Sequence, residues 1–254
     1  MKPFENKVVV ITGAAGGIGE ATARMLHAQG ARLLLTDREP DGVERLAGEL
    51  GDGVAAMAVD VSREADNQAM IEAAEKRFGA VNAVFLNAGI EGRVGPMDSL
   101  EQADWDKVFA VNVHGVRMGI LAALPALRRV GGGSILITAS VAGVRGAAGL
   151  SPYVSSKHAV MGMMRTAAAE LGPEGIRVNT VNPGPVDNRM MRSIEDQASP
   201  GHGDDVKAGF VERMPLGRYV TNEEVAGVAV LLLSDASSGV TGTHYLVDAG
   251  LTAH

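Results

Sequence analysis

Short apolar runs rich in β-branched residues alternate with longer helical patterns along almost the whole chain. Between most of these runs apolar residues recur with helical spacing, as in residues 20–29, which end at Gly30. Strands that are apolar throughout and separated by helices form a parallel sheet covered on both faces. With right-handed crossovers, the pattern predicts an α/β fold: a single doubly wound, Rossmann-type parallel sheet of about seven strands with helices on both faces. The expected strands are 7–11, 32–36, 54–59, 81–86, 134–138, 176–181 and 243–247.

The length of the chain fits one large domain better than two separate ones, so a single domain is expected over residues 1–254. One segment, residues 187–215, departs from the alternation because it mixes Met, Asp, Gly and Pro after the sixth strand. Long irregular segments in compact domains are either functional or disordered. This segment is therefore predicted to be a substrate lid, with a mobile surface loop as the alternative. Its flexible apolar side chains Met190 and Met191 are candidates to cover a hydrophobic substrate.

Charge and composition exclude several classes of function. The formal net charge of −7 argues against a nucleic-acid partner, which requires a basic face. The absence of cysteine excludes a disulfide scaffold, a thiolate zinc site and thiol catalysis. The six histidines show no tight ligand spacing, so no metal site is expected. The N-terminus lacks a signal-peptide pattern, and no apolar run is expected to span a bilayer, which predicts a cytoplasmic protein without a membrane partner.

A glycine-rich turn follows the first strand and opens the first helix. It reads Thr-Gly-Ala-Ala-Gly-Gly-Ile-Gly over residues 12–19, with the spacing G-x-x-x-G-x-G. Glycines allow a tight turn and a close approach of the backbone to a ligand, and the N–H groups at a helix N-terminus suit a pyrophosphate. A glycine turn without a ligand is the alternative, but the strand before it and the helix after it favour nucleotide binding. The residues expected to bind the cofactor here are Thr12, Gly13, Gly16, Gly17, Ile18 and Gly19.

The end of the second strand bears on which dinucleotide is bound. A carboxylate at Asp37 accepts hydrogen bonds from the adenosine ribose hydroxyls and repels a 2′-phosphate. Gly16 stands where a basic residue would help to hold such a phosphate. Both residues predict NAD rather than NADP, although the neighbouring Arg38 is a cation able to meet a phosphate. A turn residue at a strand end is the plainer interpretation of Asp37.

Further motifs follow the glycine turn in order along the chain. They are Asp60-Val61, Asn87-Ala88-Gly89, Asn112, Ser140, Tyr153 with Lys157, and Pro183-Gly184. With the glycine turn they make nearly the whole chain resemble the classical short-chain dehydrogenase/reductase family. The resemblance implies the strand order 3-2-1-4-5-6-7, with the cofactor across the carboxyl ends of the strands. It also implies contacts with the cofactor from several segments. Asp60 and Val61 would contact the adenine, and Asn87, Ala88 and Gly89 would lie near the adenosine ribose. Pro183, Gly184 and Val186 would lie beside the nicotinamide, and Tyr153 and Lys157 would also contact the cofactor.

Four of these residues form the expected catalytic group. Tyr153 and Lys157 are four residues apart, on one face of a predicted helix that Ser151 caps. A free tyrosine has a pKa of about 10, and the ammonium of Lys157 and an oxidised nicotinamide both favour the phenolate, so Tyr153 is expected to be an acid/base with a lowered pKa. Ser140 follows the fifth strand and is expected to hydrogen-bond the substrate oxygen. By resemblance, Asn112 holds a water that links the lysine to solvent. Taken singly, each of these residues is equally compatible with an inert structural role.

These motifs predict an NAD(H)-dependent oxidoreductase that interconverts a secondary alcohol and a ketone. The pocket is expected between residues 91–94, residues 140–150 and the lid. A wall of small apolar side chains favours a small apolar or cyclic substrate, although Arg145 and Glu91 leave room for a polar one. The expected wall residues are Val141, Ala142, Val144, Ala147, Ala148 and Leu150.

Alternatives on the same fold are enoyl reductase or halohydrin-lyase chemistry and a non-catalytic nucleotide-sensing protein. By resemblance, enoyl reductases space Tyr and Lys more widely, and halohydrin lyases carry Arg for the Lys and a disrupted nucleotide turn. A sensing protein typically loses Tyr153 or Lys157, both of which this chain keeps. The chain departs from the family pattern at Asn188, where a Thr that touches the nicotinamide carboxamide is common. An amide also donates and accepts hydrogen bonds, so activity is expected to survive.

The expected assembly is a homotetramer. Predicted helices over residues 104–127 and 152–171 are richer in small and apolar residues than one sheet face needs. The family pairs these helices across a two-fold axis and builds a second interface from its C-terminal strand, which gives closed symmetry.

Overall fold

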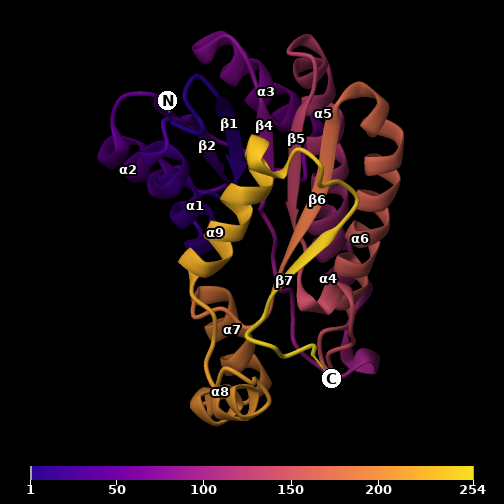
Figure 1. The fold of residues 1–254 in the computed structure, drawn as a ribbon. Helices are drawn as coiled ribbons and strands as arrows, with labels where there is room; N and C mark the ends of the chain where they lie inside the picture. Colours follow the sequence, from indigo (N-terminus) through magenta and orange to yellow (C-terminus); the bar gives the residue numbers. More distant parts are fainter. Residues whose placement is uncertain (1, 254) are drawn as a thin grey trace.

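Seven parallel strands form one sheet in the computed structural model, which describes residues 2–253 (Figure 1). The order across the sheet is β3-β2-β1-β4-β5-β6-β7. The fold class and the strand order expected from the sequence are both confirmed, and the strand ends differ from the expected ones by at most two residues. The strands are β1 (Val8–Thr12), β2 (Arg32–Asp37), β3 (Val54–Ala58), β4 (Ala83–Leu86), β5 (Gly133–Thr138), β6 (Ile176–Pro183) and β7 (His244–Val247).

Helices cover both faces of the sheet. Side chains of α1, α2 and α9 pack on one face, and those of α3, α5 and α6 pack on the other. Within β1, Val9 and Ile11 belong to the first layer and Val10 to the second, because successive side chains of a strand point to opposite faces. The helices are α1 (Gly17–Ala28), α2 (Pro40–Leu50), α3 (Glu64–Phe78), α4 (Gln102–Phe109), α5 (Val116–Arg129), α6 (Ser151–Leu171), α7 (Arg189–Ala198), α8 (Gly203–Glu212) and α9 (Asn222–Leu233), with short turns η1 (Met97–Ser99), η2 (Ala110–Gly115), η3 (Val141–Gly143), η4 (Gly172–Glu174) and η5 (Asp235–Ser237).

The helices α4 and α5 are joined into one continuous helix, Gln102–Arg129, by the π-helical turn η2. This helix is long and apolar enough to cross a membrane by length and composition, so the expectation that no run reaches that length is wrong. It contacts α3, β4 and β5, and Val116, Ile120 and Ala123 on its inner face belong to the core of that layer. Packing against the sheet explains the apolar character of that inner face.

The segment expected to be irregular forms two helices, α7 and α8, which lie together at the carboxyl end of β6 (Figure 1). The side-chain oxygen of Asn188 accepts hydrogen bonds from the N–H groups of Met190 (3.1 Å) and Met191 (3.3 Å), and so caps α7. The helix breakers Pro200 and Gly201 fall between the two helices and therefore interrupt neither. The expectation of an irregular segment is wrong, because the cap and the helical spacing of apolar residues outweigh the glycine and proline content.

Candidate active site

A cavity of about 1060 Å³ lies at the carboxyl edge of the sheet. It extends from the end of β2, past the ends of β1, β4 and β5, to the helices α7 and α8. Three expected site residues, Thr12, Gly19 and Asn112, lie behind its wall rather than on it. The expected residues that do line it are Gly13, Gly16, Gly17, Ile18, Asp37, Arg38, Asp60, Val61, Asn87, Ala88, Gly89, Ser140, Tyr153, Lys157, Pro183, Gly184 and Val186.

The glycines of the turn differ in how far the fold requires them. Gly13 has φ +64°, and a Cβ there would lie 2.9 Å from the Cα of Ala88. A Cβ at Gly19 would lie 2.3 Å from the carbonyl oxygen of Gly13, so α1 packs directly under the turn. At Gly16, which lines the cavity, a Cβ would meet no protein atom closer than 3.4 Å. Neither the backbone nor a neighbouring side chain therefore requires glycine at position 16, and a larger side chain there would extend into the cavity.

Asn87 joins the ends of three strands beside the cavity. Its N–H and that of Ala88 donate to the hydroxyl of Thr12 at 3.0 and 3.1 Å. Its side-chain amide donates to the carbonyl of Gly13 (3.0 Å) and accepts from the hydroxyl of Thr138 (2.9 Å). The turn after β1 is thereby fixed to β4 and β5. Thr12 thus positions the glycine turn although its side chain does not line the cavity.

A contact that sequence reasoning missed connects the glycine turn to α7. A Cβ at Gly17 would lie 2.5 Å from the side-chain oxygen of Asn222, the first residue of α9. That oxygen also accepts a hydrogen bond from the amide of Asn188 at 3.4 Å. Because Asn188 also caps α7, its amide lies between α7 and the cofactor turn. A Thr at position 188 would have one hydroxyl for both contacts, whereas the Asn amide has a separate donor and acceptor.

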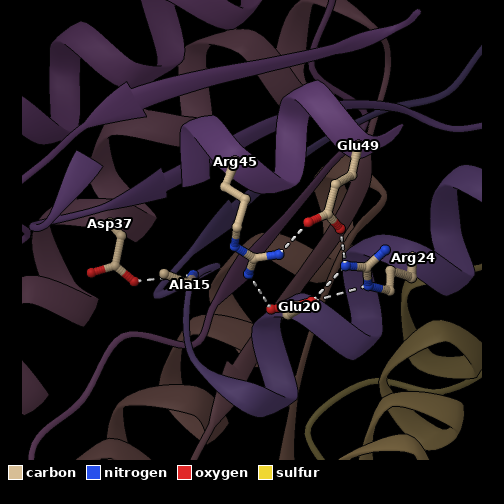
Figure 2. A network of polar contacts seen from close by, with 6 residues as sticks. All are labelled: Ala15, Glu20, Arg24, Asp37, Arg45 and Glu49. Carbon is tan, nitrogen blue, oxygen red and sulfur yellow. Dashed lines mark hydrogen bonds and ion pairs between the residues drawn. The ribbon is translucent and has the colours of Figure 1, made fainter. Parts of the chain in front are cut away.

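Asp37, at the end of β2, points toward the glycine turn (Figure 2). One carboxylate oxygen accepts from the N–H of Ala15 at 3.1 Å, and the other accepts from the N–H of Arg38 at 2.8 Å. The side chain of Arg38 is exposed and pairs with Glu39 at 3.1 Å. The carboxylate is therefore held at the cavity wall by backbone donors, while the neighbouring cation is directed to a different acid.

Figure 2 also shows a charged network between α1 and α2. Arg24 and Arg45 each bind both Glu20 and Glu49, over N···O distances of 2.5–3.0 Å. These side chains are partly exposed, and an isolated pair of this kind contributes roughly 0–1 kcal/mol. As a closed set of four, they tie α2 to α1 and so support the connection that follows Asp37 at the end of β2.

Tyr153 and Lys157 lie on α6 and are almost completely buried, with exposures of 9% and 4%. The Lys157 ammonium donates to the carbonyl of Thr138 at 2.8 Å and lies 5.6 Å from the centroid of the Tyr153 ring. The helix begins at Ser151, after Leu150 as the N-cap residue, and the Ser151 hydroxyl has no partner. The expectation that Ser151 caps this helix is wrong by one residue.

Ser140 is fixed between β5 and β6. Its hydroxyl accepts from the N–H of Ala142 (3.1 Å), donates to the carbonyl of Pro183 (3.5 Å), and hydrogen-bonds Tyr153. The amide of Asn182 donates to the Ser140 carbonyl at 2.9 Å, and its oxygen accepts from Thr180 at 2.7 Å. Asn182 is a second residue that sequence reasoning missed. A polar residue within an otherwise apolar strand was the available signal.

Asn112 lies in the π-helical turn and is fully buried. Its amide exchanges two hydrogen bonds with the backbone of Ile90, both at 2.9 Å, and donates to the Ser156 hydroxyl at 3.1 Å. A Cβ at Gly89 would lie 3.3 Å from its oxygen and 3.5 Å from the Lys157 nitrogen. Asn112 therefore positions the loop after β4 and the helix α6, and both of its amide hydrogens are already used.

Burial dominates the ionisation of the catalytic pair. It raises the pKa of Tyr153 above its ordinary value; the Ser140 hydrogen bond acts in the opposite direction, and the charge of Glu91 adds to the rise. Burial lowers the pKa of Lys157 to about 8. For the protein alone, the desolvation of the phenolate is thus the larger effect. The lowered pKa expected beside Lys157 and an oxidised nicotinamide stays a prediction for the loaded site.

The end of the cavity beyond Tyr153 contains a cluster of apolar side chains. Ala147 and Ala148 contribute to its wall as expected, whereas Val144 is partly exposed and does not line it. From the expected segment 91–94 only Val94 lines the cavity, so Glu91 acts on the site through its charge alone. The apolar cluster here consists of Ala142, Leu150, Tyr153 and Ile194, with Val94, Val154, Met190 and Met191 packed against it.

The acidic side chains of the described part of the chain do not gather into a metal centre. Among residues 2–253, no three His, Asp or Glu side chains lie close enough together to hold an ion.

At the adenosine end, Asp60 accepts from both the hydroxyl (2.6 Å) and the N–H (2.9 Å) of Ser62, and these bonds lower its pKa.

Comparison with known proteins identifies the class. A family model described as enoyl-(acyl carrier protein) reductase matches residues 13–252. Levodione reductase of Leifsonia aquatica is 37% identical over 98% of this chain and 96% of its own, and cyclohexanol dehydrogenase of Acinetobacter sp. (strain SE19) is also 37% identical, with the same coverage. The crystal structure of levodione reductase superposes with a TM-score of 0.95 over 98% of this chain and 99% of that one. That of 3-ketoacyl-(acyl-carrier-protein) reductase from Brucella melitensis, complexed with NADH, gives 0.90 at 32% identity, with the same two coverages.

The chain belongs to the short-chain dehydrogenase/reductase family. It is an oxidoreductase that works on alcohols and ketones with a nicotinamide cofactor. The description of the family model names an enoyl reductase, whereas the two named relatives reduce a ketone or oxidise an alcohol. The non-catalytic alternative is set aside, because Ser140, Tyr153 and Lys157 are all present around one cavity.

Proposed function

We propose that the protein is an NAD-dependent dehydrogenase of small cyclic secondary alcohols, with Tyr153 as the acid/base. The observation that carries the proposal is the position of the buried Ser140–Tyr153 pair. It lies in one cavity between the glycine turn and an apolar cluster. One end of this cavity suits a dinucleotide and the other a hydrocarbon ring, with the proton donor between them.

A bound nicotinamide supplies or accepts the hydride. The dinucleotide would be held by the backbone of residues 13–19 and by Asp37, and its nicotinamide end by Pro183 and Gly184, all of which line or border the cavity. The support for a pyrophosphate at this point is the glycine turn at the N-terminus of α1, where Gly13, Gly16 and Gly17 line the cavity.

Tyr153 moves the proton. With its pKa raised by burial, its hydroxyl is protonated and ready to donate to a substrate carbonyl oxygen during reduction. The Ser140 hydroxyl hydrogen-bonds the same oxygen as negative charge develops on it. During oxidation Tyr153 must first lose its proton, and the positive charge of the oxidised nicotinamide and of Lys157 favours that loss. Oxidation is therefore expected to accelerate with rising pH, whereas reduction is expected to be fast already at neutral pH.

The choice of NAD over NADP rests on Asp37. Its carboxylate is fixed at the cavity wall, and the nearby Arg38 is paired with Glu39 rather than free to meet a 2′-phosphate. Steady-state kinetics with both cofactors tests this choice. A higher kcat/KM with NADP would refute it.

A small ring is proposed as the substrate because Leu150, Ile194 and two methionines line the substrate end of the cavity with apolar side chains. Cyclohexanol and cyclopentanol are compared with the linear 2-hexanol and with glucose, and cofactor absorbance is followed. Higher kcat/KM for the cyclic alcohols is expected. Turnover confined to glucose or to an enoyl thioester would contradict the proposal.

The remaining proposals concern the lid and the assembly. The helices α7 and α8 are proposed to form the lid, because both contribute residues to the cavity. A cytoplasmic homotetramer is proposed, and the exposed Leu121 on α5 and Leu246 on β7 support the two interfaces that the family resemblance implies. Light scattering at micromolar concentration tests the assembly; a monomer would contradict it, and Leu246→Glu is expected to yield dimers.

A further inference from the structure

The two ends of the cavity carry opposite charges. At the adenosine end, the lining residues include three acids, Asp37, Glu39 and Asp60, beside Arg38. Another cation, Lys107 on α4, also lines the cavity. At the end formed by residues 142–150, α7, α8 and Leu251, the charged lining residues are all arginines and no lining residue is acidic. They are Arg145, Arg189 and Arg213.

This cluster of arginines is unusual for the chain as a whole, which has a net charge of −7. Arg192 pairs with Asp187 at 3.1 Å, and Arg218 pairs with Glu224 at 2.6 Å. Among residues 2–253, no carboxylate lies within 4.0 Å of Arg145 or Arg213. Within the same part of the chain, Arg32, Arg77 and Arg177 also lack such a partner, but they do not line the cavity.

The two arginines are positioned by neutral groups. Arg145, in the loop between η3 and α6, donates to the carbonyl of Leu251 at 3.3 Å. Arg213, at the end of α8, donates to the carbonyl of Gly209 at 3.0 Å, and its guanidinium carbon lies 4.9 Å from the centroid of the Phe210 ring. A guanidinium has five N–H donors, so each keeps most of them for a ligand.

Arg189 is set aside. It is the first residue of α7, next to Asn188, whose amide contacts Asn222 beside the glycine turn, so Arg189 lies toward the proposed cofactor end. Arg145 and Arg213 lie instead with the residues that surround the substrate end, one on the body of the domain and one on the proposed lid.

We propose that the substrate of this site carries a carboxylate at the end of its ring away from the carbinol, held between Arg145 and Arg213. This inference rests on the proposed function. The carbinol lies at Ser140 and Tyr153, the ring fills the apolar cluster, and the carboxylate extends to the guanidinium groups, whose planar geometry matches it. Because one arginine is on α8 and the other is not, a carboxylate between them also holds the lid to the body.

The test compares substrates that differ only in charge. Kinetics are measured with 4-hydroxycyclohexanecarboxylate, each isomer separately, and with its methyl ester, which keeps the size and loses the charge. A charge-assisted hydrogen bond contributes about 1.5–3 kcal/mol, so a kcat/KM at least ten-fold higher for the acid is expected. That advantage is expected to fall in 0.5 M salt, since a pair at the mouth of a cavity is partly screened.

Variants show whether these arginines cause the preference. Arg145→Gln and Arg213→Gln are each expected to lower kcat/KM for the acid about ten-fold or more and to leave that for the ester nearly unchanged. Arg145→Lys and Arg213→Lys keep the charge and are expected to restore part of the preference. Arg77→Gln, an equal loss of charge at an exposed position of α3 outside the cavity, is the control and is expected to change neither value.

The outcomes separate this inference from the proposed function. If ester and acid are used equally, or the ester better, the carboxylate site is wrong while the alcohol dehydrogenase stands. If the acid is preferred but the Gln variants keep the preference, these two arginines do not bind it. If neither compound nor any cyclic alcohol is turned over, the proposed function fails and the inference fails with it.

Discussion

The two ends of the cavity are built in different ways. The cofactor end comes mainly from one continuous strand–turn–helix unit, residues 8–28, and its key groups are fixed by backbone hydrogen bonds such as that from Ala15 to Asp37. The substrate end is assembled from segments far apart in the chain, including Val94, Leu150, Ile194 and Leu251. The cofactor end is formed largely by residues close together in sequence, in an arrangement common to dinucleotide-binding sites. The substrate end is particular to this chain and forms only when the fold is complete.

Replacing Tyr153 is expected to have the largest effect on turnover. It distinguishes the loss of proton transfer from a loss of cofactor binding. Tyr153→Phe keeps the ring and removes the transferable proton, so turnover should fall by about 10²–10⁴. Cofactor affinity should stay nearly unchanged, because the glycine turn and Asp37 are untouched. Oxidation rates against pH and fluorescence titration of the cofactor measure the two effects. Near-normal turnover would mean that another group moves the proton.

Lys157 lies where the two ends meet, and its burial has a cost in stability. Its folded pKa of about 8 is below the ordinary 10.5, so the folded protein binds fewer protons than the unfolded chain between these values. The penalty, about 3 kcal/mol, is therefore present below pH 8 and disappears as pH rises toward 10.5. Lys157→Met should be inactive yet more stable at pH 7 by about 2 kcal/mol, after the loss of the Thr138 hydrogen bond.

The check is urea denaturation of both proteins at pH 7 and pH 10. The difference in stability between variant and wild type should shrink at the higher pH. A variant that is less stable than wild type at pH 7 would show that the ammonium is better solvated or paired than its burial implies.

Asp37 tests how independent the cofactor end is. Asp37→Asn keeps an acceptor for the N–H of Ala15 but loses the charge, and Asp37→Ala loses both. NAD affinity should fall roughly ten-fold in the Asn variant and further in the Ala variant, because hydrogen bonds to a charged group contribute about 1.5–3 kcal/mol. NADP should be affected less or should gain. Titration with both cofactors gives the ratio of NAD affinity to NADP affinity. If this ratio is unchanged in both variants, Asp37 does not determine the choice of cofactor.

Breaking the contact between Gly17 and Asn222 is expected to have the smallest effect on activity. It tests whether the glycine turn at the cofactor end is coupled to the proposed lid at the substrate end. Gly17→Ala places a methyl group against Asn222, which should destabilise the fold by about 1–3 kcal/mol. Asn222→Ala should relieve most of that in the double variant. If the double variant restores stability but raises KM for substrate, the amide link from the turn through Asn222 to Asn188 also positions the lid. Failure of Asn222→Ala to restore stability would place the strain elsewhere.

The cofactor end was predictable because its signals are local. The apolar strand, the glycine spacing and Asp37 lie close together in sequence, and the strand order followed from the family resemblance. The contact between Gly17 and Asn222 was not predictable, since nothing near either residue indicates that α9 begins against the turn. At the substrate end, glycine and proline content suggested an irregular segment, although Asn188 before Met190 and Met191 was a usable helix-start signal.

The raised pKa of Tyr153 in the protein alone was not predictable, for a similar reason. The spacing of Tyr153 and Lys157 reveals the charge beside the phenol, but the extent of burial depends on the apolar cluster that forms around Leu150 and Ile194. Neighbouring charges can be inferred from one helix, whereas desolvation is a property of the complete fold.

The π-helical turn at Ala110–Gly115 has a consequence for how this chain tolerates changes of length. Such a turn is an α-helix with one residue inserted, so its removal needs only a single-codon deletion. Each residue rotates an α-helix by about 100°, and a deletion before Asn112 would turn its amide away from Ile90 and Ser156. Substitutions in this turn change one side chain, but a deletion changes the helical phase of everything up to Arg129. Single-residue deletions should therefore be tolerated far better in the surface loops of this protein than in the helix Gln102–Arg129.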